Sequence, residues 1–206
     1  MARKTTIETQ RTRQQIIDAA RKIFFCHGIA HTSLEAIAAE AGVTRGAIYW
    51  HFKNKVALFF AMREQTILPL VDRVDDVLLA SSRDADPLVG IEQAMTEIFK
   101  ALDHDDAARE VFQIIQLRCE YVGEFAAVVT EFEKSQNTLV AKLSVAYRRA
   151  GAKGLLRPGL KPVPLALDSV MFLSGLIRRR LSSEAKRLGR REVLRAIRTH
   201  LDLRRA

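Results

Sequence analysis

Apolar side chains recur at every third or fourth position along most of the chain, which is the period of an amphipathic α-helix. No window alternates between apolar and polar residues as a half-buried β-strand does. The pattern therefore predicts an all-α protein with about nine helices. We expect them at about residues 8–27, 33–41, 45–52, 55–79, 88–102, 105–117, 122–149, 164–181 and 190–203.

Small polar residues and glycines mark the ends of the first four helices. Gly28 suits the left-handed position that ends a helix. Thr32-Ser33-Leu34-Glu35 has the spacing of a capping box that opens the second helix. Gly42 provides the next turn, and Thr44 and Asn54 are placed to cap the third and fourth helices. Three short helices therefore precede a long one.

Pro69 falls inside the fourth predicted helix. A proline removes one helical hydrogen bond, so a kink or break is expected near residues 65–66. Two interpretations stay open. The proline either curves the helix over a core, or it marks a change of direction between domains, so that binding in one domain moves the helices of the other.

The segment TRGAIYWHFKNK, residues 44–55, places four ring-bearing residues side by side. On a helix, Ile48 and Phe52 lie four positions apart and share the buried face. Tyr49, Trp50 and His51 then face outward or lie at the boundary. Two helices joined by a glycine-containing turn, the second with a polar outer face, form a helix-turn-helix, whose second helix enters the major groove of DNA.

Each outward residue of this segment has a chemistry that suits DNA. Arg45 can donate two hydrogen bonds to guanine O6 and N7, and Ala47 can touch a thymine methyl group. Gly46 lets the backbone approach the DNA closely. Tyr49, His51 and Lys55 can reach phosphates, as can backbone N–H groups at the helix starts near Ser33 and Lys55. The predicted DNA-binding set is Ser33, Thr44, Arg45, Gly46, Ala47, Tyr49, Trp50, His51 and Lys55.

Trp50 has an alternative role, because tryptophan is rarely fully exposed. It could pack against the first or the fourth helix, and the sequence favours neither interpretation.

Charge is unevenly distributed along the 206 residues, whose net charge is +9. Residues 1–60 hold nine Lys/Arg and four Asp/Glu, residues 61–145 hold eight and sixteen, and residues 146–206 hold sixteen and four. The basic N-terminal part suits a phosphate-binding surface. In the C-terminal part, solvated helix faces that pair with the acidic middle are the more ordinary explanation.

The segment TSLEAIAAEAGVTRGAIYWHFKNKVALF resembles the DNA-binding domain of the tetracycline-repressor (TetR) family. The segments MARKT, RCEYVGEF and SGLIRRRL resemble its branch that represses multidrug efflux operons. The resemblance implies a helix-turn-helix domain over residues 1–54 and a ligand-binding and dimerisation domain over residues 55–206. It also implies a homodimer formed through the last two helices.

The same resemblance implies a function. The expected protein is a repressor that binds a palindromic operator as a dimer, is released by a small lipophilic compound and controls an efflux operon. On the family pattern, the positions of Arg45, Ala47 and Tyr49 contact bases. Those of Trp50, His51 and Lys55 lie at or near phosphates.

A ligand pocket is expected where polar residues interrupt apolar stripes, as Gln136 and Ser174 do and as Gln116 does beside Phe112. A buried Gln or Ser satisfied by a neighbouring carbonyl is the commoner explanation for any one of them. Repressors of the efflux branch that the chain resembles often hold cationic ligands with an acidic pocket residue. Because Ile67 stands at the candidate position for that residue, the charge of the ligand stays open. The candidate pocket residues are Ile67, Ile98, Phe112, Gln116, Phe132, Gln136, Val170, Ser174 and Ile177.

The last two predicted helices carry apolar stripes that we expect to be exposed in a monomer. Two copies joined by these stripes would place their recognition helices about 34–36 Å apart, one turn of DNA. The predicted dimer residues are Leu173, Leu181, Val193, Ile197 and Leu201.

Other classes of protein find less support in the sequence. No catalytic set, phosphate-binding loop or metal-ligand spacing is recognisable, so no enzyme activity, metal or cofactor is expected. No signal peptide or membrane span is expected, and Cys26 and Cys119 suggest no disulfide, so a cytoplasmic location fits best. Three alternatives remain: a regulator of a metabolic or catabolic operon, a non-specific architectural DNA-binding protein, and a redox sensor. Against the last, Cys26 is expected near the apolar face of the first helix.

Overall fold

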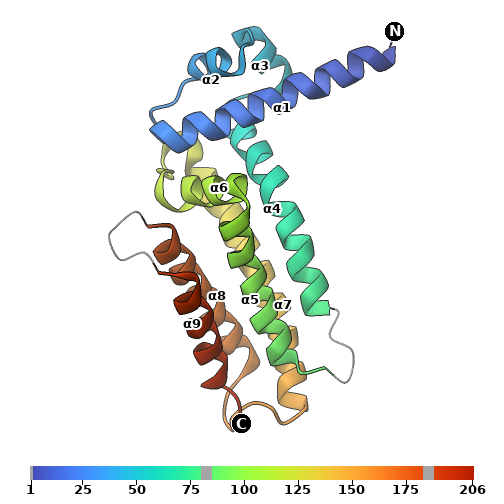
Figure 1. Cartoon of the computed structure of the whole chain (residues 1–206), viewed down its shortest axis with the longest axis vertical. Helices are drawn as coiled ribbons and strands as arrows, with labels where there is room; N and C mark the ends of the chain where they lie inside the picture. The colour runs from blue at the N-terminus through green and yellow to red at the C-terminus, as the bar shows by residue number, and fades with distance from the viewer. Residues whose placement is uncertain (1, 80–84, 183–187) are drawn as a thin grey trace. The chain divides into compact units, whose positions relative to one another are not determined.

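The computed structural model describes residues 2–79, 85–182 and 188–206, which fold into nine α-helices and one 3-10 helix (Figure 1). These residues contain no strand beyond an isolated bridge between Leu156 and Arg205. The all-α prediction is confirmed. The helices are α1 (Ala2–His27), α2 (Leu34–Ala41), α3 (Arg45–His51), α4 (Lys55–Leu79), α5 (Pro87–His104), α6 (Asp106–Leu117), η1 (Gly123–Phe125), α7 (Ala126–Ala152), α8 (Pro162–Leu181) and α9 (Arg190–Asp202).

The chain divides into two compact units. Unit 1 comprises Met1–Leu68 and Asp106–Ala126, and unit 2 comprises Pro69–Asp105 and Ala127–Ala206. By packing, α6 and η1 therefore belong with α1, α2, α3 and the first part of α4. The functional division at residue 54 stays a prediction.

Helix α4 runs without interruption from Lys55 to Leu79, so the predicted break is absent. One proline removes only a single backbone hydrogen bond of the helix. The Thr66 hydroxyl adds a bond to the Met62 carbonyl at 3.1 Å. The division between the two units falls between Leu68 and Pro69.

Local capping fixes the short helices of unit 1. The side chains of Ser33, Thr44 and Asn54 accept hydrogen bonds from backbone N–H groups three residues ahead, at 3.1, 3.2 and 2.8 Å. These caps confirm the predicted helix starts. The capping box is wrong by one residue, because Ser33 is the cap and the Thr32 hydroxyl instead donates to the Gly28 carbonyl at 2.7 Å.

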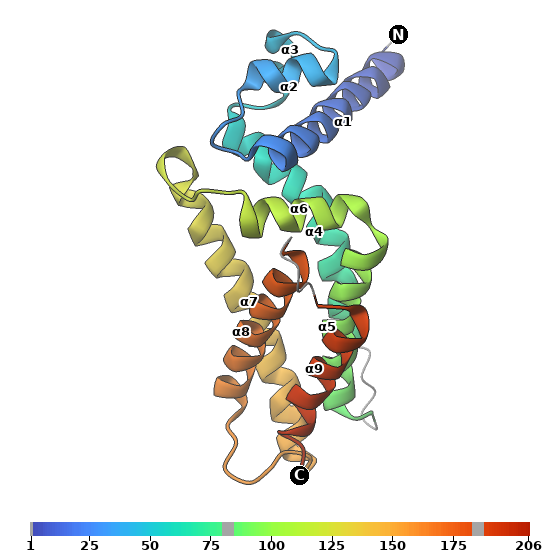
Figure 2. The same cartoon turned by 60° about the vertical axis from the view of Figure 1, so that its left-hand side comes forward.

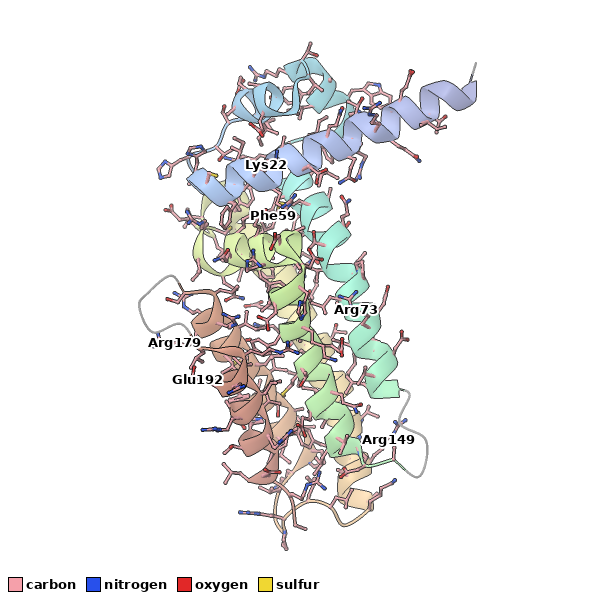
Figure 3. All side chains as sticks on the ribbon, viewed as in Figure 1. Lys22, Phe59, Arg73, Arg149, Arg179 and Glu192 are labelled. Carbon is pink, nitrogen blue, oxygen red and sulfur yellow. The ribbon has the colours of Figure 1, made fainter. Side chains whose placement is uncertain are left out.

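Helix α6 packs against α1 within unit 1 (Figure 2). Arg21 of α1 forms an ion pair with Glu110 of α6, and the backbone N–H of Ile29 donates to the Arg118 carbonyl at 3.2 Å. Phe59 of α4, labelled in Figure 3, is fully buried and meets the Phe125 ring edge-on at 5.6 Å. A segment distant in sequence thus completes the core of the helix-turn-helix unit.

Ion pairs in unit 2 join the acidic middle of the chain to the basic C-terminal part, as the charge distribution predicts. Arg180 contacts Asp103 at 2.7 Å, and Arg205 contacts Asp86 at 2.6 Å. Arg180 of α8 and Arg205 after α9 are therefore held by acids at the two ends of α5.

A buried polar chain crosses three helices of unit 2. Tyr147 of α7 shares a hydrogen bond of 2.7 Å with Ser169 of α8, which lies 3.0 Å from Nε2 of His200 of α9. Phe172 stacks on the imidazole with ring centroids 4.0 Å apart. Burial lowers the pKa of His200 to about 4, with a smaller contribution from Arg204. The imidazole is therefore neutral near pH 7.

We expect acidification to destabilise the fold through His200. The ordinary pKa of 6.5 belongs to the unfolded chain, so between pH 6.5 and about 4 the unfolded chain binds a proton that the folded one does not. Stability therefore rises with pH across this window, and the loss from pH 7 to 4.5 is roughly 2–3 kcal/mol. Urea unfolding at both pH values should show this loss in the wild type and in His104→Gln, whose parent side chain is exposed. An equal loss in His200→Gln would contradict the assignment.

The expectation that the predicted dimer residues are exposed in a monomer is wrong. Leu173, Leu181, Val193, Ile197 and Leu201 are all buried inside unit 2. They fill the space between α8, α9 and the neighbouring helices, where α9 packs against α5 as well as α8. The exposed apolar side chains of α8 are a different set, namely Val163, Leu167 and Met171.

Candidate nucleic-acid interface

The turn between α2 and α3 fixes the orientation of the recognition helix. Gly42 has φ +66°, a left-handed conformation that side chains disfavour. Ile48 and Phe52 are buried, as predicted, and anchor α3 against unit 1. With this face fixed, the opposite face of α3 is presented to solvent.

Large aromatic rings lie on that outer face. Trp50 is 72% exposed and Tyr49 is 47% exposed. The alternative in which Trp50 packs against α1 or α4 is therefore wrong. Trp50 instead meets the His51 ring edge-on at 4.6 Å. Exposed aromatics of this size on a basic surface mark a contact area for another molecule.

Arg45, the predicted base-contacting residue, begins α3 and is exposed. Its Nη1 lies 2.5 Å from a carboxylate oxygen of Glu35, and its Nη2 donates to the Tyr49 hydroxyl at 3.0 Å. The guanidinium carbon also lies 5.4 Å from the centroid of the Tyr49 ring. The side chain is thus held between α2 and α3 before any DNA binds.

The smaller predicted residues have positions that suit close approach of a partner. Gly46 is exposed, and a Cβ added there would meet only the Thr44 hydroxyl, at 3.8 Å. Packing therefore gives no reason for a glycine at this position. Ser33 and Thr44 are also exposed at the starts of α2 and α3, while Ala47 is half-buried.

Arg13 was missed by sequence reasoning. It is exposed on α1, and its guanidinium lies 5.1 Å from the centroid of the Phe52 ring. Burial, followed by the positive charge of Arg13, lowers the pKa of His51, so the free protein holds this imidazole mostly neutral at pH 7. Only a net basic composition pointed to Arg13, since 39 positions separate it from Phe52.

Lys55 does not occupy the phosphate-contacting position predicted for its side chain. The ammonium group donates to the carbonyls of Ile29 and Thr32, both at 3.1 Å, and lies 3.3 Å from Glu124. Its side chain is only 15% exposed. The lysine instead ties the turn before α2 to α4 and η1, whereas Lys53, two residues earlier, is exposed.

We expect Lys55→Ala to lower the stability of the protein by about 2–3 kcal/mol, because hydrogen bonds of a charged donor are lost and two carbonyls stay unsatisfied. Lys53→Ala should change stability by less than about 0.5 kcal/mol. Urea unfolding followed by circular dichroism compares them. A stable Lys55→Ala protein with weakened salt dependence of DNA binding would restore the phosphate-contacting role.

The candidate pocket residues divide between the two units. Ile67, Phe112 and Gln116 belong to unit 1 and are half-buried. In unit 2, Ile98, Val170 and Ile177 are buried, Phe132 and Ser174 are half-buried, and Gln136 is exposed. Each unit therefore contributes apolar candidates, and the pocket itself stays a prediction.

A small pocket of unit 2 lies elsewhere, between α5, α8 and α9. Asp103, Arg180 and Arg190 contribute to its lining. Phe99, Val193 and Leu194 supply apolar side chains to the same lining. None of the nine candidate pocket residues lines this small pocket, so the expected ligand site stays a prediction.

Both cysteines are free, and they differ in exposure. Cys26 is exposed, which corrects the expectation that it lies near an apolar face. Burial raises the pKa of Cys119 to about 11, so little thiolate is present at neutral pH. In the described ranges, no group of three His, Cys, Asp or Glu side chains could hold a metal ion. Nor does any helix there combine the length and apolar character needed to cross a bilayer.

An exposed, basic and aromatic α3, set by a capped turn against α2, defines a helix-turn-helix DNA-binding protein. Residues 16–62 match the family model described as bacterial regulatory proteins, tetR family. The regulator TtgR of Pseudomonas putida is 33% identical over 182 residues, which cover 87% of this chain and 84% of that protein. The chain belongs to the TetR family of transcriptional regulators.

Solved structures agree with this assignment over nearly the whole chain. NalD, the secondary repressor of the MexAB-OprM multidrug efflux pump in Pseudomonas aeruginosa, is 27% identical with a TM-score of 0.84. That match covers 97% of this chain and 98% of NalD. A complex of SmeT with triclosan is 29% identical with a TM-score of 0.81, over 95% of this chain and 92% of that one. SmeT is the repressor of the SmeDEF multidrug efflux pump of Stenotrophomonas maltophilia.

Proposed function

We propose that the protein is a ligand-responsive repressor that binds a palindromic operator as a dimer and controls a multidrug efflux operon in the cytoplasm. The observation that carries this proposal is the exposed Arg45, Tyr49 and Trp50 face of α3 in a chain similar to two efflux-pump repressors over nearly its full length. A small lipophilic compound releases the dimer from DNA.

The exposure of α3 in unit 1 supports the proposed DNA contacts. Arg45, Ala47 and Tyr49 contact base edges in the major groove. Trp50 and His51 lie at the phosphates. Exposed Arg13 and Lys53 supply the positive charge that half-buried Lys55, held by the carbonyls of Ile29 and Thr32, does not.

The dimer forms through the exposed face of α8. Val163, Leu167 and Met171 follow one another at a spacing of four, so they lie along one side of the helix. All three are exposed in the single chain, and a Cβ added at Gly175 would meet nothing within 4 Å. An apolar stripe that continues into a glycine allows a second copy of α8 to approach closely about a two-fold axis.

The ligand acts on DNA binding by preferring one conformation of the chain. It must bind the DNA-incompetent state more tightly, and this preference limits the response. The polypeptide passes between the units after Leu68, Asp105 and Ala126, so these crossings are the covalent routes of coupling. The triclosan complex of SmeT supports a lipophilic ligand without fixing its identity here.

Release from DNA tests this proposal. The full-length protein is bound to a fluorescent duplex from upstream of its own gene, and triclosan and other lipophilic compounds are added while anisotropy is followed. The proposal predicts that at least one compound lowers the anisotropy to the value of free DNA. Compounds that bind the protein, by calorimetry, yet leave operator affinity unchanged would contradict ligand-controlled repression.

A further inference from the structure

An acidic side chain lies on the surface that is expected to face DNA. Glu35 is in the first turn of α2, and Arg45 begins α3. The carboxylate lies 2.5 Å from Nη1 of Arg45, and both side chains are more than half exposed. The pair therefore forms across the helix-turn-helix, within reach of an approaching phosphate.

Other acids of unit 1 pair differently. Asp18 lies 3.7 Å from Arg21 on α1, and Glu40 pairs with Lys22 of α1 at 3.3 Å. Both partners, Arg21 and Lys22, are on α1 and not on the recognition helix α3. Glu35 pairs with the residue that is placed to contact bases.

The Glu35 carboxylate uses the donors that a DNA phosphate would use. Its own backbone N–H, then the Ser33 hydroxyl and Arg45, lower the pKa of Glu35, so it is charged at neutral pH. A backbone N–H at a helix start, a hydroxyl and a guanidinium are the usual ligands of phosphate in protein–DNA complexes. In the free protein Arg45 already holds an anion, the Glu35 carboxylate.

The second Nη group of Arg45 is also occupied, by the Tyr49 hydroxyl at 3.0 Å. One N–H of each Nη is engaged in this way, so a partner that uses both nitrogens shares the guanidinium with these bonds or replaces them. A guanine offers two acceptors in the plane of the guanidinium and replaces them well. A phosphate placed beside Arg45 gains similar bonds but also meets the charge of Glu35.

We propose that Glu35 is a specificity-determining residue, which lowers the affinity for random DNA by competing with phosphates for Arg45. It acts through Arg45 and does not itself contact bases. Since an exposed ion pair is weak, the correct operator displaces it at little cost. The inference rests on the proposed role of Arg45 as a base-contacting residue.

Glu35→Gln tests this inference, because it keeps the size of the side chain and removes its charge. Affinities for the operator and for a scrambled duplex are measured by anisotropy at physiological salt. We expect scrambled DNA to bind roughly 3–10-fold more tightly and the operator to change by less than about 2-fold. The ratio of the two affinities then falls several-fold.

Glu40→Gln is the matched control, since it removes the same charge from the same helix beside Lys22. It should change the affinities for the operator and for the scrambled duplex by the same factor and leave their ratio unaltered. In an Arg45→Ala background, Glu35→Gln should also leave the ratio unaltered.

If the wild type prefers its operator, either of two results would overturn the inference. One is an unchanged ratio in Glu35→Gln, and the other is the same fall in ratio with Arg45 absent. A wild type without operator preference would overturn the proposed function as well, so the two failures are distinguishable.

Discussion

Leu167→Glu is expected to convert the protein to a monomer and to weaken operator binding by ~100-fold or more. Leu167 is 51% exposed on α8, midway between the exposed Val163 and Met171. Two glutamates meeting about a two-fold axis would bury like charges in an apolar contact. A monomer then loses the gain from binding two linked half-sites.

Light scattering during size-exclusion chromatography gives the mass, and anisotropy gives the operator affinity. Val89→Glu is the matched control, because Val89 is an exposed apolar residue of unit 2 on α5. It should remain dimeric. A dimeric Leu167→Glu protein at micromolar concentration would exclude the exposed face of α8 as the interface.

Arg45→Ala is expected to remove sequence discrimination at one base pair in each half-site, at a cost of about 1–3 kcal/mol per contact. A dimer makes the contact twice, so the operator affinity should fall by roughly 1.5 to 4.5 orders of magnitude. Stability should stay within about 0.5 kcal/mol, because the side chain is exposed and its ion pair with Glu35 is weak.

A set of operators with single symmetric mismatches locates the lost contact. For Arg45→Ala, the mismatch at the contacted base pair should cost nothing further, while other mismatches keep their cost. Lys53→Ala should weaken binding to every duplex alike and reduce the salt slope by about one per half-site. If the two variants gave the same mismatch profile, the division between base and phosphate contacts would be wrong.

The parts of the structure that depend on neighbours in sequence could be predicted from sequence. Ser33, Thr44 and Asn54 cap their helices through bonds to residues three positions ahead. Ile48 and Phe52 are buried because a spacing of four places them on one helix face. The helix-turn-helix is a local motif, so local rules sufficed to find it.

The predictions that failed depend on contacts with distant parts of the chain, which the local sequence pattern does not identify. Lys55 was expected at DNA because its charge suggested a phosphate, but its partners, Ile29 and Thr32, are carbonyls more than twenty positions earlier. The stripe of Val193 and Ile197 was correctly identified as apolar, yet periodicity cannot tell whether a second copy or α5 of the same chain covers it.

The central claim is sequence-specific binding by the exposed face of α3, and one measurement tests it most directly. Anisotropy of a labelled duplex from upstream of the gene is compared with that of a scrambled duplex of equal length at physiological salt. The account predicts a preference of ~10³-fold or more for the native duplex, and a smaller preference in Arg45→Ala. Equal, strongly salt-dependent binding to both duplexes would contradict it and indicate a non-specific architectural DNA-binding protein.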